Sequence, residues 1–378
     1  MNWLQLSDAD RIAAVNVATR QLGFNANVIE KDWWVVMALK ALFGSSIKDY
    51  ASFKGGTSLS KGWGLIERFS EDADIALDKS FWGLAGDTRT QRERIRKLAR
   101  AYIREKLTPE LDAMLRDMGA TDFEMRFVEA DDSDKDPTVV LVPYRSLFTA
   151  NAYVPAQVKI EMSSRSLKEP LERIRIRPYL AEVLPEEFAD FETEVTAVVP
   201  SRTFLEKIFL LHEELQKEHP RTRRITRHLY DIEHLMDTDF GREALADTRL
   251  WVDIVKHRAV FNGIRGIDYK TLHPSTIIFI PQREIRERWA DDYASMRENF
   301  IYGDALSFDD LIARLEVLQE RIRQIRIDDP FFKTLPKTQA VGQGMRRRLR
   351  RRAQSRQASI EIGKVGRNRY ICIIDHED

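Results

Sequence analysis

Two adjacent glycines, followed by two aspartates in an alternating pattern, constrain this chain more than any other feature. Residues 54–61 (KGGTSLSK) contain the glycine turn, and residues 72–77 (DADIAL) alternate acidic with small or apolar side chains. Side chains two positions apart point to the same face of a strand. Asp72 and Asp74 therefore project together while Ala73 and Ile75 face a core. The pattern predicts a half-buried strand that carries paired carboxylates.

Paired carboxylates of this kind indicate a metal site. Two carboxylates held side by side repel each other unless a cation lies between them. Their oxygens suit Mg²⁺, which takes one or two protein carboxylates together with substrate phosphates. Gly55 and Gly56 allow backbone N–H groups to approach a triphosphate closely, and Thr57 adds a hydroxyl. The pattern therefore predicts Mg²⁺-assisted nucleotidyl transfer, with the metal on Asp72 and Asp74.

Each half of the pattern has an ordinary explanation when it stands alone. A single Asp-x-Asp is usually a solvated strand edge, and a Gly-Gly pair is a common turn. A P-loop is excluded, because Walker A ends in Gly-Lys followed by Ser or Thr. Here Ser60 precedes Lys61 and Gly62 follows it. The functional interpretation therefore depends on further motifs.

Charge, cysteine content and hydropathy limit the classes of protein to which this chain can belong. The chain has 60 basic and 60 acidic residues, but residues 1–344 carry 50 basic and 56 acidic residues, so the excess of positive charge lies at the C-terminus. The single cysteine, Cys372, permits no intramolecular disulfide, which is typical of a reducing cytoplasm. No run approaches 18 apolar residues, and no secretory signal pattern is present. We expect a cytoplasmic protein without a membrane span.

The order of periodic segments predicts an α+β fold. Strand patterns cover residues 50–54, 72–78, 122–129, 138–144 and 153–162, and helical patterns cover 8–21, 26–42, 57–66, 88–118, 203–214, 223–236, 242–261, 282–299 and 307–326. The long helix is expected to break near Pro109. We expect an α/β domain with N-terminal helices over residues 1–198, a helical domain over 199–330 and a basic, flexible tail over 331–378.

Two further charged residues have competing interpretations. Glu161 lies on the polar face of the strand at 153–162, where it is a candidate third metal ligand or a partner of Arg165 or Arg173. Arg68 is close enough in sequence to the glycine turn to add positive charge for phosphates, as is Lys61. The alternative for Arg68 is an ion pair with Glu71.

Five motifs together resemble a known family. Residues 53–61 and 65–74 resemble the turn and Asp-x-Asp signature of polymerase-β-like nucleotidyltransferases, in particular the AbiEii/AbiGii-type toxins of bacterial toxin–antitoxin and phage-defence systems. Residues 29–33 (IEKDW), 203–207 (TFLEK) and 227–232 (RHLYDI) are similar to other motifs of that family. The resemblance runs from about residue 5 to about residue 327. Ala73 departs from it, because a larger aliphatic residue is more usual there.

The resemblance implies roles for residues outside the strand. It implies a mixed polymerase-β-like sheet with flanking helices, Lys207 as a contact to the nucleotide phosphates, and Asp231 as an essential acid. Arg224 and Arg227 lie one helical turn or two from Asp231, on one face. A lysine across a cleft can neutralise a phosphate, and Asp231 can orient that lysine or the arginine pair, so we include Arg224 and Arg227 among the expected phosphate contacts.

The resemblance also implies partners: an NTP, an RNA acceptor, which is expected to be the tRNA 3′ end, and a cognate antitoxin. Two alternatives remain, namely transfer to a protein side chain or small molecule, and a catalytically idle nucleotide-binding protein. The arginine-rich residues 346–352 are not part of the resemblance. Blocks of like charge often contact nucleic acid, so this block is a candidate RNA contact or simply a divergent end.

Overall fold

The computed structural model describes residues 2–86, 88–130, 136–149, 154–164, 170–188 and 191–333, and the backbone of 358–365 and 368–375. Contacts divide the chain into two compact units, Met1–Ile327 and Asp328–Asp378. In the second unit, strands β8 (Ala358–Val365) and β9 (Asn368–Asp375) form an antiparallel hairpin. The arginine-rich block at residues 346–352 lies outside the described residues.

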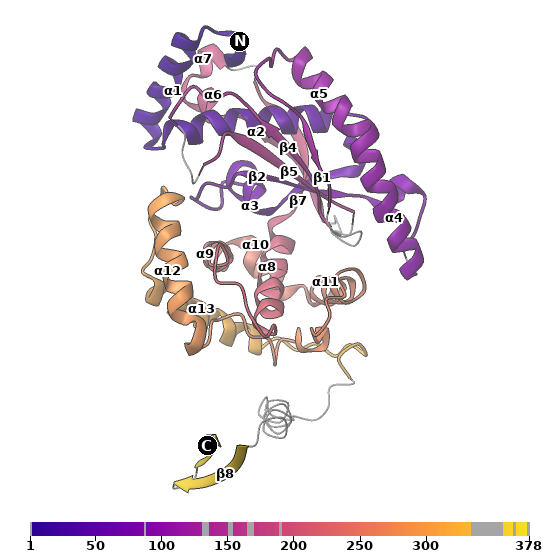
Figure 1. Cartoon of the computed structure of the whole chain (residues 1–378), viewed down its shortest axis with the longest axis vertical. Coiled ribbons are helices and arrows are strands. Elements are labelled where there is room, and N and C mark those ends of the chain that lie inside the picture. Colours follow the sequence, from indigo (N-terminus) through magenta and orange to yellow (C-terminus); the bar gives the residue numbers. More distant parts are fainter. Residues whose placement is uncertain are drawn as a thin grey trace. The chain divides into compact units, whose positions relative to one another are not determined.

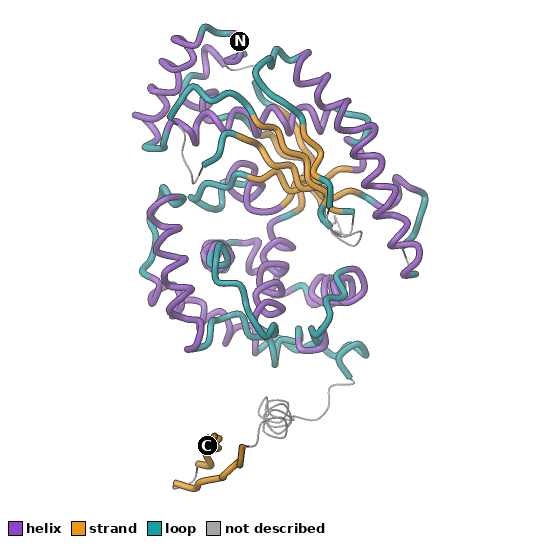
Figure 2. The backbone as a smooth tube through the Cα atoms, in the orientation of Figure 1, coloured by secondary structure: helices purple, strands orange, loops and turns teal. Residues whose placement is uncertain are grey.

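A seven-stranded mixed sheet forms the centre of the first unit (Figures 1 and 2). Its strand order is β3-β4-β5-β2-β1-β7-β6. The strands are β1 (Ala51–Lys54), β2 (Asp72–Leu77), β3 (Arg126–Val128), β4 (Thr138–Pro143), β5 (Gln157–Ser163), β6 (Leu171–Ile176) and β7 (Thr193–Val198). Strand β2 runs antiparallel to β1 and parallel to β5. The expected α+β class with a mixed sheet is confirmed.

Helices precede, flank and follow the sheet (Figure 1). They are α1 (Asp8–Leu22), α2 (Ala26–Gly44), α3 (Gly55–Thr57), α4 (Arg89–Tyr102), α5 (Thr108–Asp117), α6 (Tyr179–Val183), α7 (Pro185–Phe188), α8 (Pro200–Leu215), α9 (Arg227–Leu235), α10 (Asp239–Ala246), α11 (Thr248–Phe261), α12 (Arg283–Asn299) and α13 (Phe308–Arg323). Within the described parts of the chain, none of them has the length and apolar character that a bilayer crossing requires.

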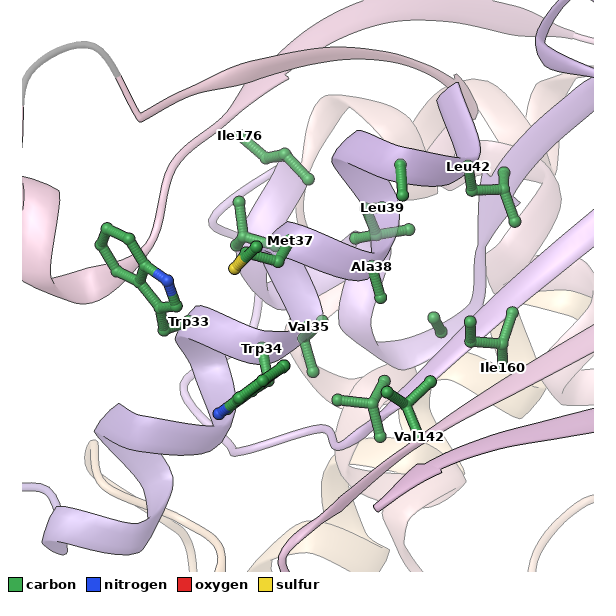
Figure 3. Packing of buried hydrophobic residues seen from close by; sticks show 14 of the residues in the cluster. Trp33, Trp34, Val35, Met37, Ala38, Leu39, Leu42, Val142, Ile160 and Ile176 are labelled. Atoms are coloured by element: carbon green, nitrogen blue, oxygen red, sulfur yellow. The ribbon is translucent and has the colours of Figure 1, made fainter. Parts of the chain in front are cut away.

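Helix α2 is the centre of the main core. Most of its side chains are buried, because strands and neighbouring helices surround it rather than cover one stripe. Figure 3 shows Trp33 and Trp34 of this helix together with Val142, Ile160 and Ile176 from the sheet. Each large apolar side chain buried in this way stabilises the fold by roughly 1.5–3 kcal/mol. The core thus covers one face of the sheet, and Asp72 and Asp74 lie on the other face.

The chain changes from sheet to helices between β7 and α8. Strand β7 ends at Val198, and α8 begins at Pro200, where a proline costs no hydrogen bond because the first helical N–H groups have no intrahelical acceptor. The following helices nevertheless belong to the same compact unit as the sheet.

Three local expectations differ from the structure. Strands β6 and β7 were not expected. Strand β6 lies at the sheet edge, where half of its side chains are exposed and the alternation is weak. The long helix does not break at Pro109, because a π-helical turn at Ile103–Leu107 leads into α5 and places the proline in its first turn. The helix expected at 242–261 is two helices, since Asp247 accepts a hydrogen bond from the N–H of Leu250 (2.9 Å) and starts α11.

Candidate active site

Three carboxylates lie next to one another on the sheet. Asp72 and Asp74 alternate with buried residues along β2. In the register of β2 with β5, Asp74 lies opposite Glu161 and Asp72 lies opposite Lys159. The expected grouping of Asp72, Asp74 and Glu161 is therefore what the strand pairing produces. Glu161 also forms an ion pair with Lys159, a neighbour on its own face.

This ion pair corrects the expected partners of Glu161. Arg173 pairs with Glu194 on the neighbouring strand instead, and Arg165 lies outside the described residues. The reason is geometric, because residues two apart on a strand share a face and Lys159 is the nearest cation on that face.

The carboxylates of Asp72 and Asp74 hold protons more tightly than isolated aspartates do. Burial, together with the negative charges of Glu161 and Asp72, raises the pKa of Asp74 to about 7. Burial also raises the pKa of Asp72, although Lys159 opposes the shift. In the described part of the chain, no three acidic, histidine or cysteine side chains are arranged as a formed metal centre. The cluster is thus a set of crowded oxygen ligands whose repulsion a bound cation would relieve.

The two glycines of the turn allow two close approaches. Gly55 has φ +79°, and a Cβ atom at this position would lie 2.0 Å from Oδ2 of Asp74. A Cβ atom at Gly56 would lie 2.7 Å from Nη2 of Arg68 and 2.8 Å from Oγ of Ser70. Any larger residue would therefore displace the carboxylate or the guanidinium. The glycines position these side chains, in addition to any contact that they make with a phosphate.

Thr57 and Lys61 are engaged with the protein. The hydroxyl of Thr57 donates a hydrogen bond to the carbonyl oxygen of Asp72 (2.5 Å), which ties the turn to the start of β2. The ammonium of Lys61 lies 2.9 Å from Oδ1 of Asp32 and 3.3 Å from the centre of the Tyr179 ring. The structure therefore brings Lys61 to α2 and does not place it among the residues that line the cleft described below.

Asp231 joins two buried cations. Nε and Nη2 of Arg68 lie 2.6 and 2.7 Å from the two oxygens of Asp231, and Nζ of Lys207 lies 2.7 Å from Oδ2. Burial alone would raise the pKa of Asp231, but Arg68 and Lys207 outweigh it and hold that pKa well below its usual range. Burial lowers the pKa of Lys207, and Asp231 opposes this shift. The carboxylate thus keeps both cations charged and fixes their positions.

The partner of Arg68 corrects the alternative weighed from the sequence. Glu71 does not pair with Arg68; it binds Nζ of Lys31 (2.8 Å) and the guanidinium of Arg224. Lys31 is the central residue of the motif at 29–33. Its neighbours Glu30 and Asp32 are also buried, Glu30 accepting from the N–H of Leu147 (3.0 Å) and Asp32 pairing with Lys61. Each charge of this motif therefore anchors a different segment.

A cleft of about 210 Å³ lies beside these residues, and four arginines contribute to its lining. The lining includes Arg68, Glu71, Arg223, Arg224, Arg227 and Phe300. Burial, followed by the charges of Arg68 and Arg224, lowers the pKa of Arg227. Its Nε atom is buried and has no hydrogen-bond partner among the described residues. An unpaired buried donor between cations is costly, and an anionic ligand would satisfy it.

Sequence reasoning missed Asp292, which shapes the cleft. Its carboxylate accepts hydrogen bonds from the N–H groups of Arg224 (2.5 Å), Ile225 and Thr226 (both 3.1 Å). It thereby fixes the start of α9 and holds Arg224 at φ 57°. No local signal could have identified it, because Asp292 lies on α12, far along the chain.

The loop before β2 is held by a second distant segment. The N–H of Phe69 donates to the carbonyl oxygen of Phe300 (2.7 Å), and the N–H of Tyr302 donates to that of Glu67 (3.1 Å). Arg68 and Ile301 form an isolated antiparallel bridge. The residues after α12 therefore set the position of Arg68 and of one wall of the cleft.

Comparisons with known proteins place this arrangement in a family. The sequence model of the nucleotidyl transferase AbiEii toxin of type IV toxin–antitoxin systems matches residues 38–314. The structure is similar to that of JHP933 from Helicobacter pylori, with 16% identity, TM-score 0.40, and coverage of 78% of this chain and 92% of that one. A candidate nucleotidyltransferase from H. pylori gives 14% identity, TM-score 0.39, and coverage of 78% and 93%.

A search of curated proteins found no match. The family model spans most of the chain and includes the glycine turn, both aspartates of β2, Lys207 and Asp231. This chain therefore belongs to the nucleotidyl transferase AbiEii toxin family of type IV toxin–antitoxin systems, and it is a nucleotidyltransferase.

Proposed function

We propose that this chain transfers a nucleotide from an NTP to an RNA acceptor, the 3′ end of tRNA, with Mg²⁺ bound by Asp72, Asp74 and Glu161. One observation carries the proposal. Three crowded carboxylates, one with its pKa raised to about 7, lie in the electrostatic field of Arg227, which lines an arginine-rich cleft. A divalent cation would neutralise the carboxylates, and the triphosphate that it accompanies would neutralise the arginines.

The carboxylates fit a divalent cation by their chemistry. All are oxygen ligands, and burial together with the repulsion among them raises the pKa of Asp74, which is the behaviour of a site arranged for positive charge. Mg²⁺ binds through one or two protein carboxylates and substrate phosphates. When bound, the ion would supply charge neutralisation at the phosphates.

The cations of the cleft divide into two groups. Arg227 has a buried Nε without a hydrogen-bond partner among the described residues, and Arg224 is exposed although it pairs with Glu71, so both can approach phosphate oxygens. Arg68 and Lys207 are fixed by Asp231, which presents them as a preorganised positive wall. We assign phosphate binding to Arg224, Arg227 and Lys207, the orientation of Lys207 and Arg68 to Asp231, and the close approach of Asp74 to Gly55.

Gly56, Thr57 and Lys61 were expected to contact phosphates, and this proposal gives them other roles. Gly56 makes room for Arg68, and the hydroxyl of Thr57 holds the backbone of Asp72. Lys61 stabilises α2 through Asp32. A phosphate can reach the N–H groups of these residues only where the turn exposes them. We therefore propose that all three residues position other groups of the site.

The biological role follows from the family. A type IV toxin–antitoxin system implies a nucleotide substrate and an antitoxin partner for this chain. A tRNA acceptor, a cytoplasmic location and action in phage defence belong to the proposal. The single cysteine fits a reducing cytoplasm, and the proposed metal-assisted transfer to a hydroxyl fits the 3′ end of an RNA.

Total tRNA incubated with each labelled NTP and the full chain tests the proposal. We expect label on RNA with Mg²⁺, none with EDTA and none with Asp74→Asn. The matched control is Glu172→Ala, because Glu172 is an exposed acid on the edge strand β6. Label on protein or on a small molecule with equal Mg²⁺ dependence would identify the alternative acceptor. The absence of label on any fraction would overturn the proposal.

A further inference from the structure

The helix at residues 89–106, here called the cationic helix, has an unusual charge. It contains eight basic and two acidic residues, a net charge of +6, in 18 positions of α4 and the π-helical turn that follows. Residues 1–327 as a whole contain 48 basic and 54 acidic residues, a net charge of −6. The rest of this unit therefore carries −12, and the cationic helix is a positive element on an acidic body.

The helix presents one row of its cations outward. Ile95, Ala99 and Ile103 are buried and attach it to the body of the protein. The opposite side carries Arg94, Lys97 and Arg104, which are exposed and lie at spacings of three and seven residues, so they share one face. Figure 1 shows α4 at the outer margin of the first unit, beyond the edge of the sheet.

The three cations of this outward row have weak partners or, among the described residues, no ion pair. Within the part of the chain that the structure describes, Arg94 and Lys97 form no ion pair. Arg104 pairs with Glu105 (2.9 Å) and Glu129 (3.5 Å), but all three side chains are exposed. Pairs of this kind are weak and easily exchanged for another anion.

The spacing suits a polyanion. A helix rises 1.5 Å per residue, so Arg94 and Arg104 are separated by roughly 15 Å along the axis, enough to meet two or three successive backbone phosphates. A membrane surface is a poorer partner, because an interfacial helix exposes a broad apolar face. Here the apolar face is buried, and Leu98, at 38% exposure, is the large apolar side chain left exposed on the helix.

We propose that the cationic helix binds the phosphate backbone of the acceptor RNA at a distance from the bond that is made. This inference rests on the proposed RNA acceptor but concerns binding rather than chemistry. The remainder of the unit has a net negative charge, which disfavours RNA on most of its surface, so the helix both attracts the acceptor and restricts its orientation.

The test measures binding of fluorescein-labelled total tRNA, by anisotropy, without NTP and in EDTA. The variant is Arg94→Glu/Lys97→Glu/Arg104→Glu. Its matched control is Arg20→Glu/Lys48→Glu/Arg249→Glu, which changes net charge equally at exposed positions on other elements. Each phosphate contact contributes about −0.7 to the slope of log affinity against log salt. We expect the variant to bind about tenfold more weakly or worse, with a slope smaller by about 2.

Several outcomes decide the matter. Equal affinity and slope for variant and control would overturn the proposal. If the variant loses affinity equally for tRNA and for a polyglutamate peptide, the helix attracts acidic chains in general. That result would overturn the proposal of a binding site for RNA. A triple Gln variant, which removes charge without reversing it, guards against misfolding and should lose about half as much in log affinity. The binding assay contains no NTP and is therefore independent of the chemistry. Binding of tRNA in this assay, together with no label on any fraction in the NTP assay, would refute the proposed function and leave this inference standing.

Discussion

Arg68 and Asp231 form a two-point ion pair, with Nε and Nη2 of the arginine 2.6 and 2.7 Å from the two carboxylate oxygens. The two residues are 163 positions apart, and both are buried. Lys207 binds the same carboxylate at 2.7 Å. One acid thus connects the loop before β2, helix α8 and helix α9, and it determines where the positive wall of the cleft lies.

Asp231→Asn should be strongly destabilising. The substitution keeps the size of the side chain but leaves Arg68 and Lys207 buried without a counter-charge, which costs about 3–5 kcal/mol. The free energy of unfolding in urea measures the effect. The control is Asp253→Asn, because Asp253 lies 3.8 Å from Arg249 in an exposed pair, where little change is expected. A loss no larger than that of the control would show that Asp231 does not hold the two cations.

Asp72→Ala and Asp74→Ala should each abolish nucleotide transfer and any toxicity. Each removes one of the proposed metal ligands, yet each also relieves repulsion among the carboxylates, so the melting temperature should hold or rise slightly. Transfer assays and calorimetry on the same preparations test both halves. Glu172→Ala serves as the control for both. Transfer at the wild-type rate in either variant would contradict the assignment of that aspartate as a metal ligand.

The contribution of Asp74 to the stability of the metal-free chain should fall as the pH rises from about 4 to about 7. The pKa of Asp74 is about 7 in the folded chain, against an ordinary value of 3.8. Between these values the folded chain keeps a proton that the unfolded chain has released, so rising pH favours unfolding. Urea midpoints of wild type and Asp74→Asn across this range isolate the contribution, since Asn cannot titrate. Parallel curves for the two proteins would contradict it.

Gly55→Ala should impair transfer far more than Gly64→Ala. Both glycines have positive φ, +79° and +61°, so both substitutions strain the backbone by a similar amount. A methyl group at position 55 would also meet Oδ2 of Asp74 at 2.0 Å, whereas one at position 64 meets nothing within 4 Å. The difference in transfer rate at matched stability therefore reports the displacement of Asp74. Equal rates in the two variants would argue that the carboxylate can move without cost.

Deletion of residues 345–378 should weaken RNA binding and reduce its salt dependence, while Mg²⁺-dependent NTP binding stays unchanged. The deleted segment carries ten basic and four acidic residues, and the salt slope becomes smaller with every phosphate that the protein no longer neutralises. Combining the deletion with the triple Glu variant of the cationic helix tests independence, because two separate RNA-binding segments should give additive losses of affinity. Unchanged affinity after the deletion would assign RNA binding to the first unit alone.

The sequence by itself predicted the features that depend on local pattern. The alternation at residues 72–77 placed Asp72 and Asp74 on one face, and the strand around Glu161 supplied a third carboxylate for the same face. Strand periodicity and glycine turns are properties of a few neighbouring residues, so they can be recognised without the fold. The same is true of the family motifs, which identified the class of enzyme before any contact was known.

The tertiary structure alone decided which charges meet. Arg68 binds Asp231 rather than the nearby Glu71, Lys61 turns to Asp32, and Asp292 organises the start of α9 from another helix. Residues close in sequence look like natural partners, but an ion pair in a core forms between the groups that packing buries together. The energetic reason is desolvation: a buried charge needs a partner in its own cavity, and only the folded chain determines which one is there.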